Sequence, residues 1–277
     1  MTKKAFKPSR IVVHIVLLGV AATAIYPFVF MFLSSLKEKS EYYVNLLGLP
    51  QNPSFLRYEI LFDRFDVGRM LFNSLVVNGT AVFVTMFLAT MTAYIFVMFP
   101  TKFGNRITDL IISSMMIPSI VLLIPVYYMM AKANLVNNYL SLIIVYIALM
   151  MPFSLYFATT GMKSIPDSCI EAAMIDGASV SNIYFKIVLP MVKPVMITLF
   201  VVNFLWSWNE LLYAMLLLQT NEMRTMTVGV ATIIGKHTVN MPMLNAGLLI
   251  NSLPVIVLFA FTQKYFIKGL TAGAVKE

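Results

Sequence analysis

Few residues of this chain have the types and spacing that catalysis needs. The sequence has two histidines, His14 and His237, and one cysteine, Cys169. Such isolated groups form neither a nucleophile–base pair nor a disulfide framework. Long apolar runs separate the two histidines and place them on opposite sides of the membrane described below, so they cannot share a metal ion. The sequence therefore predicts no catalytic residue and no metal site.

One glycine-containing stretch approaches the phosphate-binding loop of ATPases without matching it. That loop follows the pattern G-x-x-x-x-G-K-[ST], in which the Ser or Thr holds Mg²⁺. Here five residues separate Gly229 from Gly235, and Lys236 is followed by His237. The chain is therefore expected to bind no cofactor and to hydrolyse no ATP by itself.

The elements that must position any functional residue are membrane helices. Of the 277 residues, 60% are hydrophobic and only 12% are charged, with a net charge of +8. Soluble domains have about 25% charged residues, so this chain has too few to cover a soluble surface. Its Lys and Arg residues lie between apolar runs rather than in a stripe, which argues against a nucleic-acid partner.

Six apolar runs are long enough to cross a bilayer, since a transmembrane helix needs about 20 residues. They are too long for the strands of a barrel, the other structure that satisfies its backbone in lipid. We therefore expect an all-α integral membrane protein with a single domain over 1–277, a bundle of six transmembrane helices. The expected spans are 11–33, 74–99, 107–131, 139–160, 194–218 and 244–267.

The distribution of Lys and Arg predicts the orientation, because cytoplasmic loops carry the excess. Twelve of these residues fall on the side that holds both termini, and eight on the opposite side. Both termini and the loop 161–193 are therefore expected in the cytoplasm, and the segments 34–73 and 219–243 outside. The first run continues to Phe32, which favours a retained span over a cleaved signal peptide.

The loop 161–193 has the features of two short helices. Ser164 and Pro166 are suited to begin the first helix, and Glu171–Met174 favours helix formation. Ile170, Ala173 and Met174 recur at helical spacing and predict one apolar face. Gly177 permits the left-handed turn that ends a helix. A bent connector lying against the membrane is the simplest interpretation of this pattern.

The second helix of the loop is expected over 180–189. Ser179 can cap its start, and Pro190 is expected to close it. The loop is thus predicted to be helix, glycine bend and helix, lying under the membrane.

The spacing of residues in this loop resembles the EAA loop of ABC importer permeases. The match extends to Asp176 and Pro194, as in the sugar-importing branch of that family, and runs from the first span to the C-terminus. Further matching segments are Asn73-Ser74-Leu75, Trp206–Glu210, Leu253-Pro254 and Gly269–Lys276. The residues at the defining loop positions are Glu171, Ala172, Ala173, Gly177, Ile187, Leu189 and Pro190.

The resemblance implies a set of partners and a location in the bacterial cytoplasmic (inner) membrane. In that family the permease pairs with a second, homologous permease subunit, binds two cytoplasmic ATPase subunits and receives its solute from an extracytoplasmic solute-binding protein. ATP would be bound by the ATPase subunits, and the solute would be a sugar or oligosaccharide. The loop around Glu171, including Asp176, would dock into an ATPase subunit. The polar tail 269–277, with Thr271, Gly273 and Lys276, would lie at the ATPase interface.

The span 194–218 contains the candidates for the solute path. Asn203, Ser207 and Glu210 recur on one helix face. Because a charged side chain in mid-membrane costs roughly 2.5–3.5 kcal/mol on insertion scales, Glu210 should face the bundle interior. There it would either hydrogen-bond a neighbouring helix or line the path. Trp206 would either stack on a sugar ring or pack as an ordinary interfacial aromatic.

Two alternatives to a sugar importer stay open. One is an ABC permease for another solute, such as an amino acid, phosphate or a polyamine; nearly uncharged spans favour a neutral solute instead. The other is a secondary transporter driven by an ion gradient, which inverted repeats or buried charge pairs would favour. The sequence has no obvious internal repeat.

Overall fold

The structure is a computed structural model that describes residues 8–233 and 240–274, with side chains over 11–233 and 240–264. Within these ranges the regular elements are helices, and no strand occurs. The all-helical class predicted from the sequence is therefore confirmed. The chain forms two compact units, one from residues up to Val67 together with Val230–Leu253, the other from Gly68–Gly229 and the residues after Leu253.

In the first unit, a buried lysine organises the segment that follows the N-terminal helix. The Lys37 ammonium donates hydrogen bonds to the carbonyl oxygens of Asn45 (2.5 Å) and Leu46 (3.1 Å). The Ser35 and Tyr58 hydroxyls form a hydrogen bond of 2.7 Å. These bonds offset the cost of burying polar groups. The unit contains α1 (Pro8–Ser35), α2 (Lys39–Val44), α3 (Leu56–Phe65) and parts of α13 (Met226–Thr232) and α14 (Met241–Ala274).

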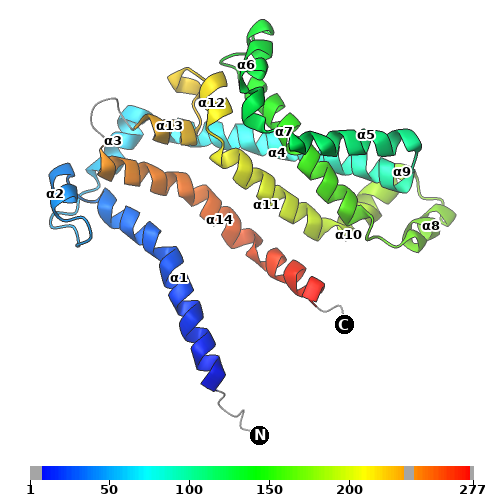
Figure 1. The fold of residues 1–277 in the computed structure, drawn as a ribbon, viewed down its shortest axis with the longest axis horizontal. Helices are drawn as coiled ribbons and strands as arrows, with labels where there is room; N and C mark the ends of the chain where they lie inside the picture. The colour runs from blue at the N-terminus through cyan, green and yellow to red at the C-terminus, as the bar shows by residue number, and fades with distance from the viewer. Residues whose placement is uncertain (1–7, 234–239, 275–277) are drawn as a thin grey trace. The chain divides into compact units, whose positions relative to one another are not determined.

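The second unit is built around α7, which packs against both α5 and α11 (Figure 1). Its buried residues form two apolar clusters, one around Tyr146, Phe204 and Trp208 and one around Tyr94 and Tyr184. Besides its share of α13 and α14, the helices are α4 (Val67–Met98), α5 (Lys102–Ser113), η1 (Ser114–Met116), η2 (Ser119–Leu122), α6 (Leu123–Lys132), α7 (Tyr139–Met162), α8 (Asp167–Ile175), α9 (Val180–Ile183), the π-helical η3 (Tyr184–Val188), α10 (Leu189–Met191), α11 (Lys193–Asn209), α12 (Leu212–Leu217) and η4 (Asn221–Met223).

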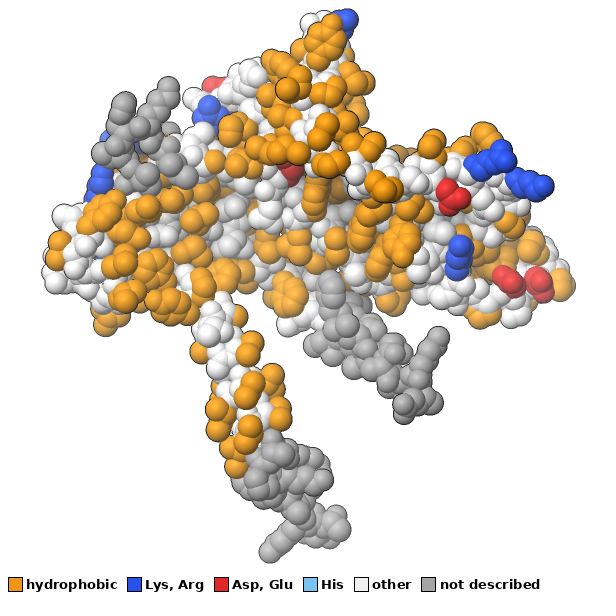
Figure 2. All heavy atoms as spheres, viewed as in Figure 1, with side chains coloured by type: hydrophobic (Ala, Val, Ile, Leu, Met, Phe, Trp, Pro, Cys, Tyr) orange, Lys and Arg blue, Asp and Glu red, His pale blue; other side chains and the backbone are white. Residues whose placement is uncertain are grey.

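Within the part of the chain that the structure describes, four helices are long and apolar enough to cross a membrane, by length and composition. Two bent pairs, Lys102–Met116 with Ser119–Lys132 and Val180–Met191 with Lys193–Asn209, raise the number to six if each pair is one span. Figure 2 shows hydrophobic side chains over much of the visible helical surface, as lipid contact requires. The four unbroken helices are Ile11–Ser35, Val67–Met98, Tyr139–Met162 and Met241–Lys264.

The run expected as one span over 107–131 is broken in the middle. Its two halves meet at an angle of 94°. The break falls at Ile117 and Pro118, where Ile117 has the extended backbone that the residue before a proline adopts (φ −85°, ψ 116°). Proline also supplies no N–H to continue the helix. The run is predominantly apolar on both sides of the break, so hydropathy alone does not reveal it.

Candidate functional site

The first helix of the loop, α8, ends in the glycine bend that its sequence predicts. Gly177 has φ +77°, the left-handed conformation. The Gly177 N–H donates to the Met174 carbonyl and the Ala178 N–H to the Ala173 carbonyl, both at 3.0 Å. This pair of bonds is the Schellman motif, which satisfies carbonyls at a helix end and turns the chain sharply.

The start of α8 differs from expectation. The Ser164 hydroxyl donates to the Gly161 carbonyl of the preceding helix (2.6 Å), and Pro166 occupies the position before the first helical residue, Asp167. Ser164 is therefore not the N-cap of α8. Its hydroxyl finds an acceptor in the last turn of α7, a local bond that serine commonly makes.

The second helix begins at the predicted residue but extends beyond its predicted end. The Ser179 hydroxyl accepts a hydrogen bond from the Asn182 N–H (3.3 Å). The helix then widens into the π-helical turn η3 and continues through Pro190 to Met191. Pro190 does not close it, because the wider turn accommodates a residue that lacks an N–H.

Only part of the predicted docking set lies on the surface. Glu171, Ala172, Asp176, Gly177 and Pro190 are exposed. Ala173 is buried, and Ile187 and Leu189 are partly buried against the same apolar cluster. These three residues hold the loop in place, whereas the other five lie at its surface.

The apolar face of α8 is also narrower than predicted. Ile170 and Ala173 are buried, whereas Met174 is exposed and Ile175 is 86% exposed. The surface of α8 therefore carries two adjacent apolar side chains. The helical spacing alone did not separate Met174 from the buried pair.

The loop is anchored to the transmembrane helices by close contacts. A Cβ atom at Gly161 would lie 2.8 Å from a methyl carbon of Val195, so the end of α7 and the start of α11 require glycine there. The Tyr94 hydroxyl donates to the Val180 carbonyl (3.0 Å), and the Thr90 and Tyr184 hydroxyls share a bond of 2.9 Å. These contacts could not be predicted from the sequence, because the residues that they join are far apart in the chain.

Glu210 lies at a break in the span that was expected to run unbroken over 194–218. Helix α11 ends at Asn209, Glu210 is extended (φ −69°, ψ 128°), and α12 begins at Leu212. The Glu210 carboxylate accepts hydrogen bonds from the N–H groups of Tyr213 (2.9 Å) and Ala214 (3.0 Å) and from the Tyr146 hydroxyl (2.9 Å). It therefore caps α12, where a negative charge is favoured.

The other path candidates have different surroundings. Asn203 is buried, and its amide donates to the Ser154 hydroxyl on α7 (2.8 Å). Ser207 is buried and donates to the Phe204 carbonyl of its own helix (3.3 Å). Since the helix breaks before Glu210, that residue does not continue the face of Asn203 and Ser207.

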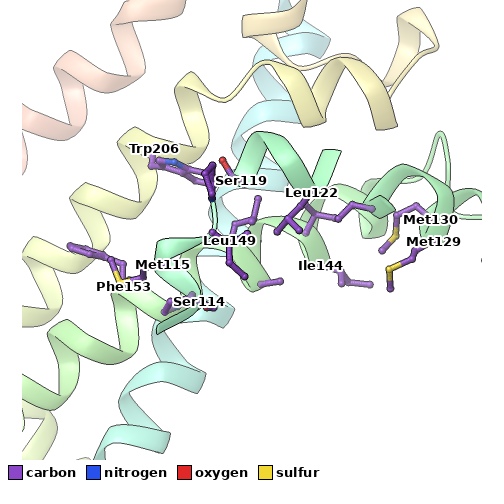
Figure 3. A pocket seen from close by; sticks show the side chains of 16 residues that line it. Ser114, Met115, Ser119, Leu122, Met129, Met130, Ile144, Leu149, Phe153 and Trp206 are labelled. Atoms are coloured by element: carbon purple, nitrogen blue, oxygen red, sulfur yellow. The ribbon is translucent and has the colours of Figure 1, made fainter. Parts of the chain in front are cut away.

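Trp206 faces a cavity of about 540 Å³ in the second unit. Figure 3 shows Trp206 and Phe153 at one end of this cavity and Met129 and Met130 at the other. The lining is mostly apolar and includes no charged side chain. The Trp206 ring is 39% exposed and meets the edge of Tyr146, with centroids 5.6 Å apart and planes at 76°.

The segment after α12 is clamped by the start of α4. The buried Asn73 amide donates to the carbonyls of Glu222 and Arg224, both at 2.9 Å, and its oxygen accepts from the Tyr139 hydroxyl (2.7 Å). The next residue, Ser74, accepts from the Met226 N–H (2.8 Å). Both amide protons of Asn73 are thus used on one short loop, and its oxygen is bonded to Tyr139 of α7.

The last helix extends into the predicted tail 269–277 and passes Gly269 and Gly273 without a break. Helix α14 continues to Ala274, so the backbone of Thr271 and Gly273 is helical. Lys276 lies outside the described residues, as do Lys236 and His237. Among the residues with described side chains, no group of three or more His, Cys, Asp or Glu could hold a metal ion.

The fold and site define a multi-pass membrane protein with a bent two-helix loop at one end of its helices. Residues 81–271 match the family described as binding-protein-dependent transport system inner membrane component. That match covers more than half of the chain, and the protein belongs to this family. The chain is therefore a permease subunit of an ABC transporter and not its ATP-hydrolysing enzyme.

Relatives match nearly the full chain. The melibiose/raffinose/stachyose import permease protein MelC of Bacillus subtilis (strain 168) is 32% identical over 258 residues, 93% of each chain. The arabinooligosaccharides transport system permease protein AraQ of the same organism is 30% identical over 275 residues, 98% of this chain and 97% of that one.

A solved structure has the same fold. It is a bacterial ABC transporter involved in import of the acidic polysaccharide alginate, and one of its chains superposes with a TM-score of 0.77 at 23% identity. The superposition covers 96% of this chain and 100% of that one.

Proposed function

We propose that this protein is the permease subunit of an importer for a neutral sugar or oligosaccharide in the bacterial inner membrane. The observation that carries the proposal is the full-length similarity to permeases named for melibiose, raffinose, stachyose and arabinooligosaccharides. The absence of a charged side chain from the cavity lining supports a neutral solute over an acidic one, because a charged solute needs an opposite charge once it leaves water.

The working complex contains this chain, a homologous second permease, two ATPase subunits and an extracytoplasmic binding protein. Both termini and the α8–α9 loop face the cytoplasm. The exposed residues of α8 dock on an ATPase subunit: Glu171 orients the contact by its charge, and Met174 and Ile175 supply apolar area. The tail residues Thr271, Gly273 and Lys276 add contacts to the ATPase.

The solute passes beside Trp206, whose ring is partly exposed in the cavity. The flat apolar face of a sugar ring can pack on such an aromatic surface. Asn203, Ser207 and Glu210 support this part of the path from behind, through their bonds to Ser154, Phe204 and α12.

A sugar panel tests the substrate class. The binding protein that assembles with this permease is titrated with neutral sugars, acidic sugars, amino acids and polyamines by calorimetry, and the bound solutes are then offered to the complex in proteoliposomes. We expect ATP-dependent uptake of a neutral sugar. Uptake of only a charged solute would overturn the substrate class, and uptake driven by an ion gradient without ATP would overturn the importer class.

The docking role of α8 has a separate test. Glu171→Lys reverses an exposed charge and should abolish stimulated ATP hydrolysis and uptake while the permease still inserts. Lys163→Glu, a change of charge of equal size and opposite sign at an exposed residue just before α8, is the control. Normal transport by the Glu171 variant would remove this role.

A further inference from the structure

Two pairs of residues connect the α8–α9 loop to α4 with matched spacing. Thr90 and Tyr94 lie one turn apart on α4, and Val180 and Tyr184 lie one turn apart on the second loop helix. Thr90 bonds Tyr184 and Tyr94 bonds Val180, so the two segments run in opposite directions where they meet. Residues four apart share a helix face, which brings both bonds to one contact.

The direction of the first bond follows from the hydroxyl protons. The Thr90 hydroxyl has one proton, and the Met86 carbonyl lies 2.7 Å from its oxygen. With that proton used inside α4, the Tyr184 hydroxyl must donate to the Thr90 oxygen. The Tyr94 hydroxyl donates to the Val180 carbonyl, which also accepts from the Tyr184 N–H.

These bonds lie within an otherwise apolar contact. Thr90, Tyr94 and Tyr184 are buried, and the two tyrosine rings pack with centroids 5.1 Å apart. The surrounding cluster includes Ile183 and Val188 of the loop and Ala93 of α4. Apolar packing has no preferred direction, so the loop could slide or turn on α4 without breaking it. Hydrogen bonds have strict geometry, and two of them one turn apart resist both motions.

We infer that Thr90, Tyr94 and Tyr184 are positioning residues that lock the α8–α9 loop to α4, so that a displacement of the loop moves α4 directly. The inference rests on the proposed docking of α8 on an ATPase. Without this lock, the displacement would reach the transmembrane helices only through the ends of α7 and α11, which the loop connects. The solute path would then respond incompletely to ATP.

Phenylalanine variants test the lock with little disturbance. Tyr184→Phe leaves the Thr90 hydroxyl bonded to Met86, and Tyr94→Phe leaves the Val180 carbonyl bonded to the Tyr184 N–H. Tyr156→Phe, at an exposed tyrosine of α7, is the matched control. The complete complex is reconstituted in liposomes, and the amount of solute imported per ATP hydrolysed is measured.

We expect each variant to lower this ratio about two- to tenfold, the range that one ordinary hydrogen bond allows, and the double variant to lower it further. Stimulated ATP hydrolysis should stay within twofold of wild type. An unchanged ratio in the double variant would overturn the inference. An equal fall in the rates of solute uptake and ATP hydrolysis, with a reduced yield of folded complex, would also overturn the inference, because that result shows a purely structural role.

A distance measurement separates this inference from the proposed function. Spin labels are placed at Ser181→Cys and Phe83→Cys, both exposed, in a Cys169→Ser background. With the lock intact, the distance between the labels should be the same with and without trapped ATP. In the double phenylalanine variant it should shift or broaden when ATP binds. If no tested solute is imported, the proposed substrate fails, whereas an ATP-dependent distance in the wild-type chain overturns the lock.

Discussion

Gly177 is the residue whose backbone conformation the loop requires. Its φ of +77° costs an L-residue about 1–2 kcal/mol, and no atom lies within 4 Å of the position of an added Cβ. A side chain at this position therefore meets backbone strain but no steric clash. This isolates the effect of the bend from the effect of packing.

Gly177→Ala should reduce uptake and stimulated ATP hydrolysis together, because the strain depletes the docking conformation of the loop about 5- to 30-fold. Gly79→Ala is the control: Gly79 lies in α4 with equally open space around a Cβ, and alanine favours a helix. Both rates are measured in proteoliposomes at equal permease content. Equal rates for the two variants would show that the bend is not required.

Glu210 is a charged residue that lies where helix α12 starts. Glu210→Gln keeps the size of the side chain but weakens charge-assisted bonds to α12 and Tyr146. We expect it to lower the free energy of unfolding by about 1–3 kcal/mol. Thermal unfolding in detergent, followed by tryptophan fluorescence, measures the change.

The control for Glu210 is Glu222→Gln. Glu222 is exposed, and Asn73 bonds its backbone carbonyl, which the substitution keeps. This variant should unfold like wild type. Equal shifts of the unfolding temperature in the two variants would show that the Glu210 carboxylate stabilises the fold no more than an exposed carboxylate does.

At the scale of elements, the clamp between α4 and the segment after α12 predicts a graded response. Asn73→Leu removes three hydrogen bonds and leaves two carbonyls without their donor. Tyr139→Phe removes only one of the three. Amide hydrogen exchange over 221–232 should therefore increase strongly in the first variant and weakly in the second.

Uptake should follow the same order while basal ATP hydrolysis persists, because the clamp lies on the side opposite the predicted ATPase contact. Exchange that rises equally in both variants would mean that Asn73 does not hold the segment. Loss of basal ATP hydrolysis would show that the clamp stabilises the whole fold and not this segment alone.

The helices themselves were predictable, whereas the sequence did not show which prolines would break them. Long apolar runs specify spans because lipid demands that backbone groups bond within the helix. Pro27, Pro152 and Pro254 lie inside continuous helices, whereas Pro118 ends one. Whether a proline breaks a helix depends on residues that are distant in the chain. At the break beside Pro118, the Tyr213 hydroxyl donates to the Ser119 carbonyl (2.6 Å).

The candidate site divides in the same way. The Gly177 bend and the Ser179 cap follow from local residue preferences, so the sequence predicts them. The exposure of Met174 and the bonding partners of Tyr184 and Glu210 depend on residues brought together by packing. No spacing rule within one segment reveals such contacts.

At the scale of the whole molecule, orientation depends on small differences in charge along an apolar chain. In the predicted six-span topology, twelve Lys and Arg residues fall on the side of the termini and eight on the other. Basic residues are retained on the cytoplasmic side, so the α8–α9 loop should meet the cytoplasmic ATPases. Reversal of this orientation would bring α8 to the outside and exclude the proposed docking.

The single cysteine tests this orientation without a new label site. Cys169 lies on α8 and is exposed. A maleimide that cannot cross membranes should label it in inside-out vesicles and leave it unlabelled in right-side-out vesicles. Tyr43→Cys in a Cys169→Ser background, at an exposed residue of α2, should show the opposite pattern. Bound ATPase subunits should then slow the labelling of Cys169, because docking covers α8. Labelling of Cys169 from the outside would reverse the topology, and labelling at an unchanged rate in the assembled complex would place the ATPase contact away from this helix.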